Sequence, residues 1–174
     1  SGIGQHNDLV NPYQYLCFMG GIANGGESIS PYLVKKITDA NGRTIKKANR
    51  DSTKMMSEKN ATLLASMMRN NVKLNYGDSR FKGLEVCGKT GTAQNPLGDD
   101  HSTFISFAPR NNPKIAIAVY VEHGIWGATA AVPIASLLKE LYLTDTIKRP
   151  HLVDYVKTLK LDYFKAYDRH KSKK

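Results

Sequence analysis

The stretch from Gly83 to Thr90, GLEVCGKT, could carry two different kinds of chemistry through a single lysine. It satisfies the pattern G-x-x-x-x-G-K-[ST], in which backbone N–H groups and a lysine bind nucleotide phosphates. The same letters also begin a Lys89-Thr90-Gly91-Thr92 segment, whose ammonium and hydroxyl groups could bind a substrate carboxylate from a β-strand at the edge of a cleft. Lys89 cannot serve in both kinds of site, so the surrounding residues must decide.

The context of a phosphate-binding loop is missing around Lys89. Such a loop follows a buried strand and leads into a helix, whose N-terminus faces the phosphates. Here the polar residues Gly77 to Arg80 precede the first glycine, the supposed loop Leu84 to Cys87 is rich in strand-forming residues, and Pro96 and Gly98 follow. A P-loop NTPase therefore remains only the second alternative.

A strand from Val86 to Ala93 provides the context that the carboxylate-binding interpretation needs. Because Gly91 has no side chain, the backbone of a substrate can lie close alongside the strand. Lys89 then offers an ammonium group, and Thr90 and Thr92 offer hydroxyl donors. The plain alternative is a surface strand with one solvated lysine.

The elements that would position this strand are of mixed type. Asn11-Pro12 predicts a helix that ends near Asn24, and Ser57 predicts a second helix that ends at Asn75. Asn41-Gly42 predicts a small, basic, exposed hairpin. The fold class is therefore α+β, an antiparallel sheet with flanking helices, whose strands are expected at Leu84 to Ala93, Thr103 to Ala108 and Lys114 to Glu122.

A further helix is expected from Ala128 to Tyr142. The helical period places one apolar stripe toward the core, made of Ala131, Ile134, Ala135, Leu138 and Leu141. Ser136 and Lys139 share a face that points away from this stripe. We therefore expect both to be exposed.

Composition excludes several classes of protein. The net charge of +10 need not indicate nucleic acid, because residues 145–174 alone carry nine Lys/Arg against four Asp. Cys17 and Cys87 have no metal-site spacing, so no metal or cofactor is expected. The longest apolar run, Ile115 to Val121, is far shorter than the ~18 residues of a membrane span. We expect residues 144–174 to form a basic tail that is partly helical, with Val156, Leu159 and Tyr163 on one side, and that packs against a neighbour; binding to a membrane surface is the minor alternative.

Six ordered stretches resemble the transpeptidase domain of class B penicillin-binding proteins, the peptidoglycan D,D-transpeptidases, and the elongation branch more than the division branch. These stretches are GIGQ at 2–5, NP with Gln14 at 11–14, ANGG at 23–26, KTGTAQ at 89–94, HSTFISFAP at 101–109 and PKIAIAV at 113–119. The resemblance covers roughly residues 1–140, and residues 1–143 are accordingly expected to form the C-terminal portion of that domain.

The resemblance implies a role for the K-T-G strand. Lys89, Thr90, Gly91 and Thr92 would bind the terminal carboxylate of a D-Ala-D-Ala stem peptide, or the equivalent group of a β-lactam. The backbone N–H of Thr92 would be one donor of the oxyanion hole. The enzyme would act on the extracytoplasmic, periplasmic face of the bacterial membrane, anchored by a segment outside this chain.

The nucleophile of that family lies in an S-x-x-K motif, and its proton relay includes S-x-N. S-x-N does not occur here, and S-x-x-K occurs at Ser79 to Lys82 and Ser136 to Lys139. We interpret Ser79 as a turn residue and Ser136 as a chance match beside an exposed lysine. The chain alone is then expected to be inactive, to need the N-terminal half of its domain as a partner, and otherwise to self-associate. A non-catalytic β-lactam sensor is the first alternative.

Three other side chains are candidates for a functional site, but we expect each of them to have a structural role. His101 is expected at the rim of the cleft, Trp126 in a packed loop, and Cys87 in the core as a small apolar residue.

Overall fold

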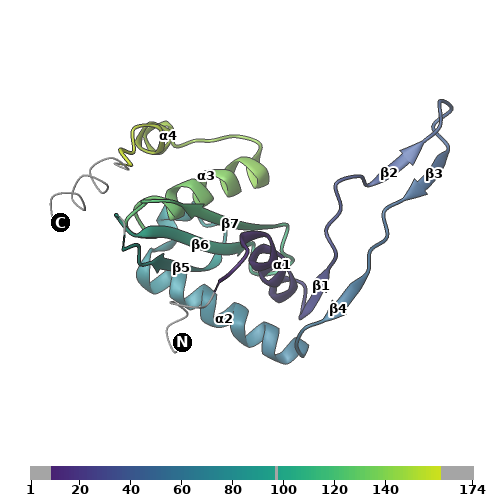
Figure 1. Cartoon of the computed structure of the whole chain (residues 1–174), viewed down its shortest axis with the longest axis horizontal. Helices are drawn as coiled ribbons and strands as arrows, with labels where there is room; N and C mark the ends of the chain where they lie inside the picture. Colours follow the sequence, from purple (N-terminus) through teal and green to yellow (C-terminus); the bar gives the residue numbers. More distant parts are fainter. Residues whose placement is uncertain (1–8, 97, 162–174) are drawn as a thin grey trace.

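A three-stranded antiparallel sheet forms the centre of the computed structural model, which describes residues 9–96 and 98–161 (Figure 1). Its strands are β5 (Cys87–Ala93), β6 (His101–Ala108) and β7 (Ile115–Val121), in that spatial order. The remaining central elements are α1 (Pro12–Ala23), α2 (Glu58–Asn75), the 3-10 turn η1 (Asp78–Phe81), α3 (Ala131–Thr144) and α4 (Pro150–Lys157). The predicted α+β class and antiparallel meander are confirmed.

The first two helices begin where their capping residues predict. The side chain of Asn11 accepts a hydrogen bond from the Tyr13 N–H, and Ser57 accepts one from the Asn60 N–H. Each bond satisfies a backbone donor that has no partner inside the helix. Capping chemistry is local, so the sequence alone locates these helix starts.

The two faces of the sheet have different covers. On one face, Cys87, Ile105 and Phe107 pack with Met19 and Ile22 of α1. On the opposite face, Phe104 and Ala108 pack with α3 through Val132 and Ala135, and with Phe81 of η1 and Val72 of α2. In Figure 1, α1 and α3 lie on either side of the sheet, while α2 runs beside β5.

The orientation of α3 differs from the one predicted from its apolar stripe. Leu138 and Leu141 are each 46% exposed, whereas Ser136 is buried and Lys139 is fully buried. The helix is therefore rotated so that two polar side chains face the protein interior. Buried polar partners explain this orientation: Lys139 Nζ donates to Ser106 Oγ at 2.5 Å, and Ser136 Oγ donates to the Arg80 carbonyl at 2.6 Å. Periodicity alone gave no indication of these partners.

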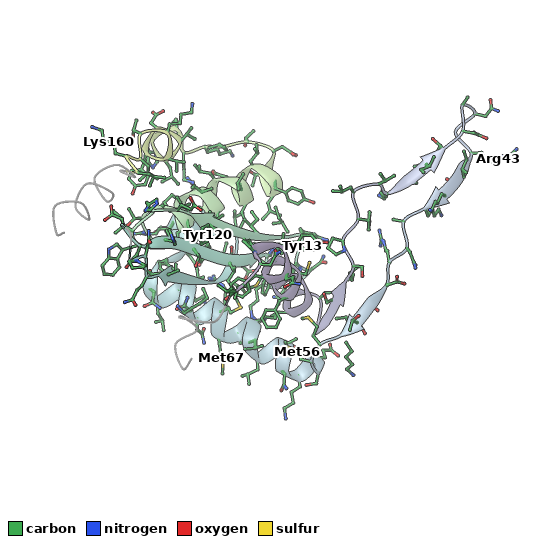
Figure 2. All side chains as sticks on the ribbon, viewed as in Figure 1. Tyr13, Arg43, Met56, Met67, Tyr120 and Lys160 are labelled. Atoms are coloured by element: carbon green, nitrogen blue, oxygen red, sulfur yellow. The ribbon has the colours of Figure 1, made fainter. Side chains whose placement is uncertain are left out.

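A long two-stranded arm extends from the body (Figure 1). The predicted hairpin is confirmed as β2 (Lys36–Thr38) and β3 (Thr44–Lys47), and it is continued toward the body by β1 (Glu27–Ile29) paired with β4 (Ser52–Lys54). The carboxylate of Asp39 accepts the N–H groups of Asn41 and Arg43, and Gly42 has a φ of +81°. Figure 2 shows Arg43 near the end of the arm, far from the sheet.

Residues after α3 fold back onto the body. Arg149 forms a buried ion pair with Glu140 at 2.7 Å and donates to the Arg80 carbonyl at 2.6 Å, so the chain before α4 is fixed between α3 and η1. Leu159 lies beyond the end of α4, and Tyr163 lies outside the described residues. No helix in residues 9–96 and 98–161 is long and apolar enough to span a membrane.

Candidate functional site

Lys89 lies on β5, the strand at one end of the described sheet. Its side chain is exposed, and among residues 9–96 and 98–161 its ammonium donates only to the neighbouring Thr90 carbonyl, at 2.8 Å. No carboxylate of the described residues forms an ion pair with it. The positive charge is therefore available to an anionic ligand. Because Lys89 and Thr90 lie inside a strand, they do not form the helix N-terminus that a phosphate-binding loop requires.

Successive residues of β5 point to opposite faces of the sheet. Lys89 is opposite Ile105 and so lies on the α1 face, with Gly91, whereas Thr90 is opposite Phe104 and lies on the α3 face, with Thr92. A ligand that contacts Lys89 and Thr92 together must therefore lie along the edge of β5. Both of these residues are exposed there.

Thr90 is held by the protein itself. Its hydroxyl forms a 2.6 Å hydrogen bond with the Tyr76 hydroxyl, which comes from the end of α2. A Cβ atom on Gly127 would lie 2.7 Å from Thr90 Cβ and 2.8 Å from the Thr103 carbonyl oxygen, so only glycine fits beside the strand. Thr90 therefore positions β5, and its hydroxyl already has an internal partner.

Gly91 has a structural reason to be glycine in addition to the expected one. A Cβ atom at this position would collide with the Thr103 hydroxyl on β6. The absence of a side chain leaves room for the Thr103 hydroxyl. It also leaves the backbone of β5 open to a close approach by a ligand.

Helix α2 braces the beginning of β5. Asn71 Nδ2 donates to the Gly88 carbonyl at 2.9 Å, and Arg69 Nη1 lies 3.5 Å from the Val86 carbonyl. The Arg69 guanidinium also contacts both carboxylate oxygens of Asp78 at 2.7 Å, and this hydrogen-bonded pair holds the pKa of Asp78 below its usual range. These contacts fix the strand before Lys89 while leaving Lys89 itself free.

In neither S-x-x-K match does the lysine form a hydrogen bond with the serine among the described residues. Ser79 is exposed in η1, as expected of a turn residue, and Lys82 has a φ of 54° just after it. Ser136 donates to the Arg80 carbonyl and accepts from Arg149 Nη2 at 2.8 Å. The expected exposure of Lys139 is wrong: burial lowers its pKa from 10.5 to about 7, but its ammonium is directed to Ser106.

Of the remaining side chains, Cys87 is buried as expected, and burial raises the pKa of its thiol to about 11. His101 Nδ1 accepts the His123 N–H at 3.1 Å, close to the end of β5. The expectation for Trp126 is wrong, because its side chain is 68% exposed. No group of three or more His, Cys, Asp or Glu within the described residues could hold a metal ion.

Sequence reasoning missed Tyr76, Asn71 and Trp126 as neighbours of the candidate site. Tyr76 and Asn71 lie on a helix that is distant in the chain, so no local pattern connects them to Thr90 and Gly88. A signal for Trp126 was present in the flanking glycines, because Gly124 and Gly127 pack their backbones against β6 and β5. The loop is therefore held close to the sheet while Trp126 extends into solvent.

Comparisons with known proteins identify the family to which this fold belongs. The family described as the penicillin binding protein transpeptidase domain matches residues 1–140. The peptidoglycan D,D-transpeptidase PbpA of Mycolicibacterium smegmatis is 31% identical over 146 residues, which are 77% of this chain and 29% of that protein. The peptidoglycan D,D-transpeptidase MrdA of Acinetobacter baumannii is 27% identical over 165 residues, covering 85% of this chain and 24% of that protein.

A solved structure of penicillin-binding protein A from Mycobacterium tuberculosis, as its penicillin G acyl-enzyme complex, superposes with a TM-score of 0.66. It is 28% identical, and the match covers 80% of this chain and 34% of that one. This chain thus spans about a third or less of the proteins that it matches. The motif order, the antiparallel sheet with its exposed K-T-G lysine, and a family match over 140 residues lead to one conclusion: the chain belongs to the penicillin-binding protein transpeptidase family.

Proposed function

We propose that this chain is the substrate-carboxylate-binding portion of a peptidoglycan D,D-transpeptidase that also binds β-lactams. The observation that carries the proposal is Lys89: an exposed ammonium with no ion-pair partner in the described part of the chain, on the edge strand of a domain from this family. Its ligand is the terminal carboxylate of a D-Ala-D-Ala stem peptide or the carboxylate of a penicillin. A charge-assisted hydrogen bond to such a group contributes about 1.5–3 kcal/mol.

In this proposal, Thr92 contributes in two ways. Its exposed hydroxyl donates to the same carboxylate, and its backbone N–H binds the oxyanion of the tetrahedral intermediate. Gly91 allows the peptide to lie against the strand, and Thr90, bonded to Tyr76, keeps the strand in place. Lys89 and Thr92 are thus the ligand-binding side chains, while Thr90 acts as a positioning residue.

The covalent step requires a serine that this chain does not provide. Its Oγ attacks the carbonyl of the penultimate D-Ala and loses its proton to a base, and the terminal D-Ala leaves with a proton on its nitrogen. The amine of a second stem peptide then attacks the acyl-serine, which forms the cross-link and restores the serine hydroxyl. Since Ser79 and Ser136 are unsuited to this role, we infer that the nucleophile lies outside these 174 residues, in a protein acting on the extracytoplasmic side of the membrane.

Acylation kinetics test the proposal. In the full-length protein, we expect Lys89→Ala to lower the second-order rate constant for acylation by a fluorescent penicillin about 10- to 100-fold. Lys114→Ala is the matched control, because Lys114 is also exposed but lies before β7, away from β5. Equal rates for the Lys89 variant and the wild type would contradict the role of Lys89.

Two further measurements separate the alternatives. The 174-residue chain alone should form no adduct with fluorescent penicillin that survives denaturation, since neither S-x-x-K serine is reactive. Turnover of a D-Ala-D-Ala peptide by the full-length protein would distinguish a transpeptidase from a β-lactam sensor, which would be acylated without releasing D-Ala from a peptide.

A further inference from the structure

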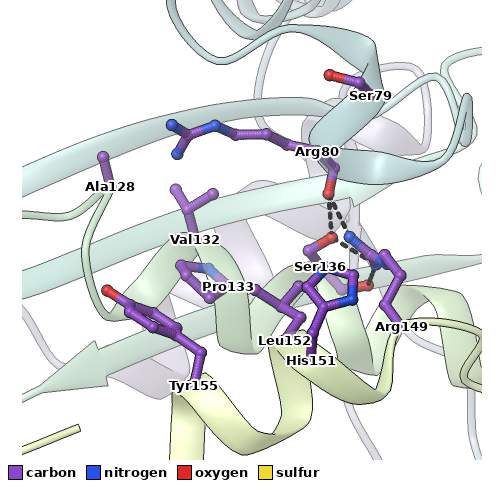
Figure 3. A pocket seen from close by; sticks show the side chains of 10 residues that line it. All are labelled: Ser79, Arg80, Ala128, Val132, Pro133, Ser136, Arg149, His151, Leu152 and Tyr155. Atoms are coloured by element: carbon purple, nitrogen blue, oxygen red, sulfur yellow. Dashed lines mark hydrogen bonds between the residues drawn. The ribbon is translucent and has the colours of Figure 1, made fainter.

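A pocket of about 590 Å³ lies where α4 folds back over α3 and η1, and none of its lining residues belongs to β5 (Figure 3). Cavities of this size accommodate small molecules. The α4 wall is formed by residues after the family match, which ends at residue 140. The pocket therefore depends on a part of this chain that the family description does not include.

The floor of the pocket is apolar and its walls carry positive charge. Val132 and Pro133 of α3 are buried, and Leu152 of α4 faces them across the space. Arg80 extends along one wall in Figure 3, and its guanidinium has no hydrogen-bond or ion-pair partner within the described residues. The imidazole of His151 lies on the α4 side.

Acidic groups around the pocket are absent from its lining or already neutralised. Asp78, next to Arg80 in η1, is paired with Arg69. Glu140 is paired with the buried Arg149, whose other donors reach Ser136 and the Arg80 carbonyl. Asp154 of α4 is exposed and does not line the pocket. Among the described residues that line the pocket, Arg80 is thus an arginine without an acidic partner, beside an apolar surface.

We propose that this pocket is a binding site for a small carboxylic acid with an apolar or aromatic body. The carboxylate pairs with the Arg80 guanidinium, which offers a planar fork of donors suited to two carboxylate oxygens. The apolar body lies on Val132, Pro133 and Leu152, where its removal from water supplies the remaining affinity. The site is separate from Lys89, which lies on the α1 face of the sheet.

Calorimetry with a matched pair of probes tests this site. The full-length protein is first treated with penicillin G, so that binding at the transpeptidase site does not contribute. We expect 2-naphthoate to bind with one equivalent per chain. 2-Naphthamide, which has nearly the same shape without the charge, should bind at least ~10-fold more weakly.

Variants locate the binding. Arg80→Gln should weaken 2-naphthoate at least ~10-fold and leave 2-naphthamide unchanged, whereas Arg50→Gln, an exposed arginine on the arm, should change neither. Leu152→Ala should weaken both probes, because both lose apolar contact. Thermal unfolding of each variant verifies that the fold is retained.

Equal affinities for the two probes, or an Arg80→Gln variant that binds 2-naphthoate like the wild type, would overturn the proposal. Loss of 2-naphthoate binding after penicillin G treatment would also overturn it, since the probe would then occupy the transpeptidase site. These outcomes leave the role of Lys89 untouched, because that role is measured by acylation.

Discussion

The two faces of the central sheet place their lysines in opposite environments, one exposed to solvent and one buried. Lys89 lies on the α1 face at the sheet edge, where it is exposed and forms no ion pair with any residue that the structure describes. Lys139 lies on the inner side of α3, fully buried, with its ammonium 2.5 Å from Ser106 Oγ and 5.6 Å from the centre of the Phe104 ring. Both lysines belong to sequence patterns associated with the same enzyme family. The comparison shows that burial and partners, more than the pattern, decide what each lysine can do.

Several charged side chains are buried on or beside α3. Glu140 and Arg149 form a hydrogen-bonded ion pair there, and Ser136 bridges Arg149 to the Arg80 carbonyl. Lys139 has no carboxylate partner within the described residues, so desolvation lowers its pKa to about 7. A buried ammonium of this kind destabilises the folded protein whenever it is protonated.

The largest effect is expected from Lys139→Met. The wild-type pKa of Lys139 rises from about 7 in the folded state to 10.5 in the unfolded state. Between these values the unfolded chain binds more protons, so the free energy of unfolding should increase with pH, by up to ~5 kcal/mol in total. The variant should lack this increase and should be more stable than the wild type at pH 6, as measured by urea unfolding across this pH range.

Lys73→Met is the control for that experiment, because Lys73 lies exposed on α2. The free energy of unfolding of this variant should depend on pH in the same way as that of the wild type. Parallel stability curves for the wild type and Lys139→Met would show that the buried ammonium does not affect stability as described.

An intermediate effect on stability is expected from Gly127→Ala, because Gly127 packs against Thr90 of the K-T-G strand. The new methyl group would lie 2.7 Å from Thr90 Cβ, so the loop or β5 must move, at a cost of about 1–3 kcal/mol in stability. Gly20→Ala is the matched control: no other group lies within 4 Å of the place that its methyl group would take in α1, and alanine favours a helix. Chemical denaturation should show loss of stability for Gly127→Ala and none for Gly20→Ala.

The smallest effect concerns association of the isolated chain. Helix α1 exposes Tyr13 (57%) and Phe18 (41%). Unpaired apolar surface favours contact with a second copy. We expect the chain to self-associate, and the double change Tyr13→Lys with Phe18→Lys to weaken association about tenfold, or ~1.4 kcal/mol, in sedimentation experiments.

Asn70→Lys provides the control on α2, where Asn70 is exposed but polar and so offers no apolar contact. We expect it to leave the association constant unchanged. A compact monomer at micromolar concentration, or an equal effect of the Asn70 change, would contradict self-association through α1.

Local chemistry made part of the structure predictable. Asn11 and Ser57 specify helix starts through their own side chains, and Asp39 with Gly42 specifies the turn of the arm. The strand around Lys89 followed from its strand-forming residues and the glycines and proline beyond it. What failed was the orientation of α3, because Leu138 and Leu141 suggested an apolar face that the interior does not use.

The helices α1, α2 and α3, the three strands of the central sheet and the family could be predicted from the sequence, because these depend on capping, strand propensity and short ordered motifs. Three features could be seen only in the packed structure: the burial of Lys139, the bond between Thr90 and Tyr76, and the position of Arg80 at a pocket beneath α4. Each of these features joins residues far apart in the chain. Their energies come from desolvation and from partners that are brought together only when the helices pack on the sheet.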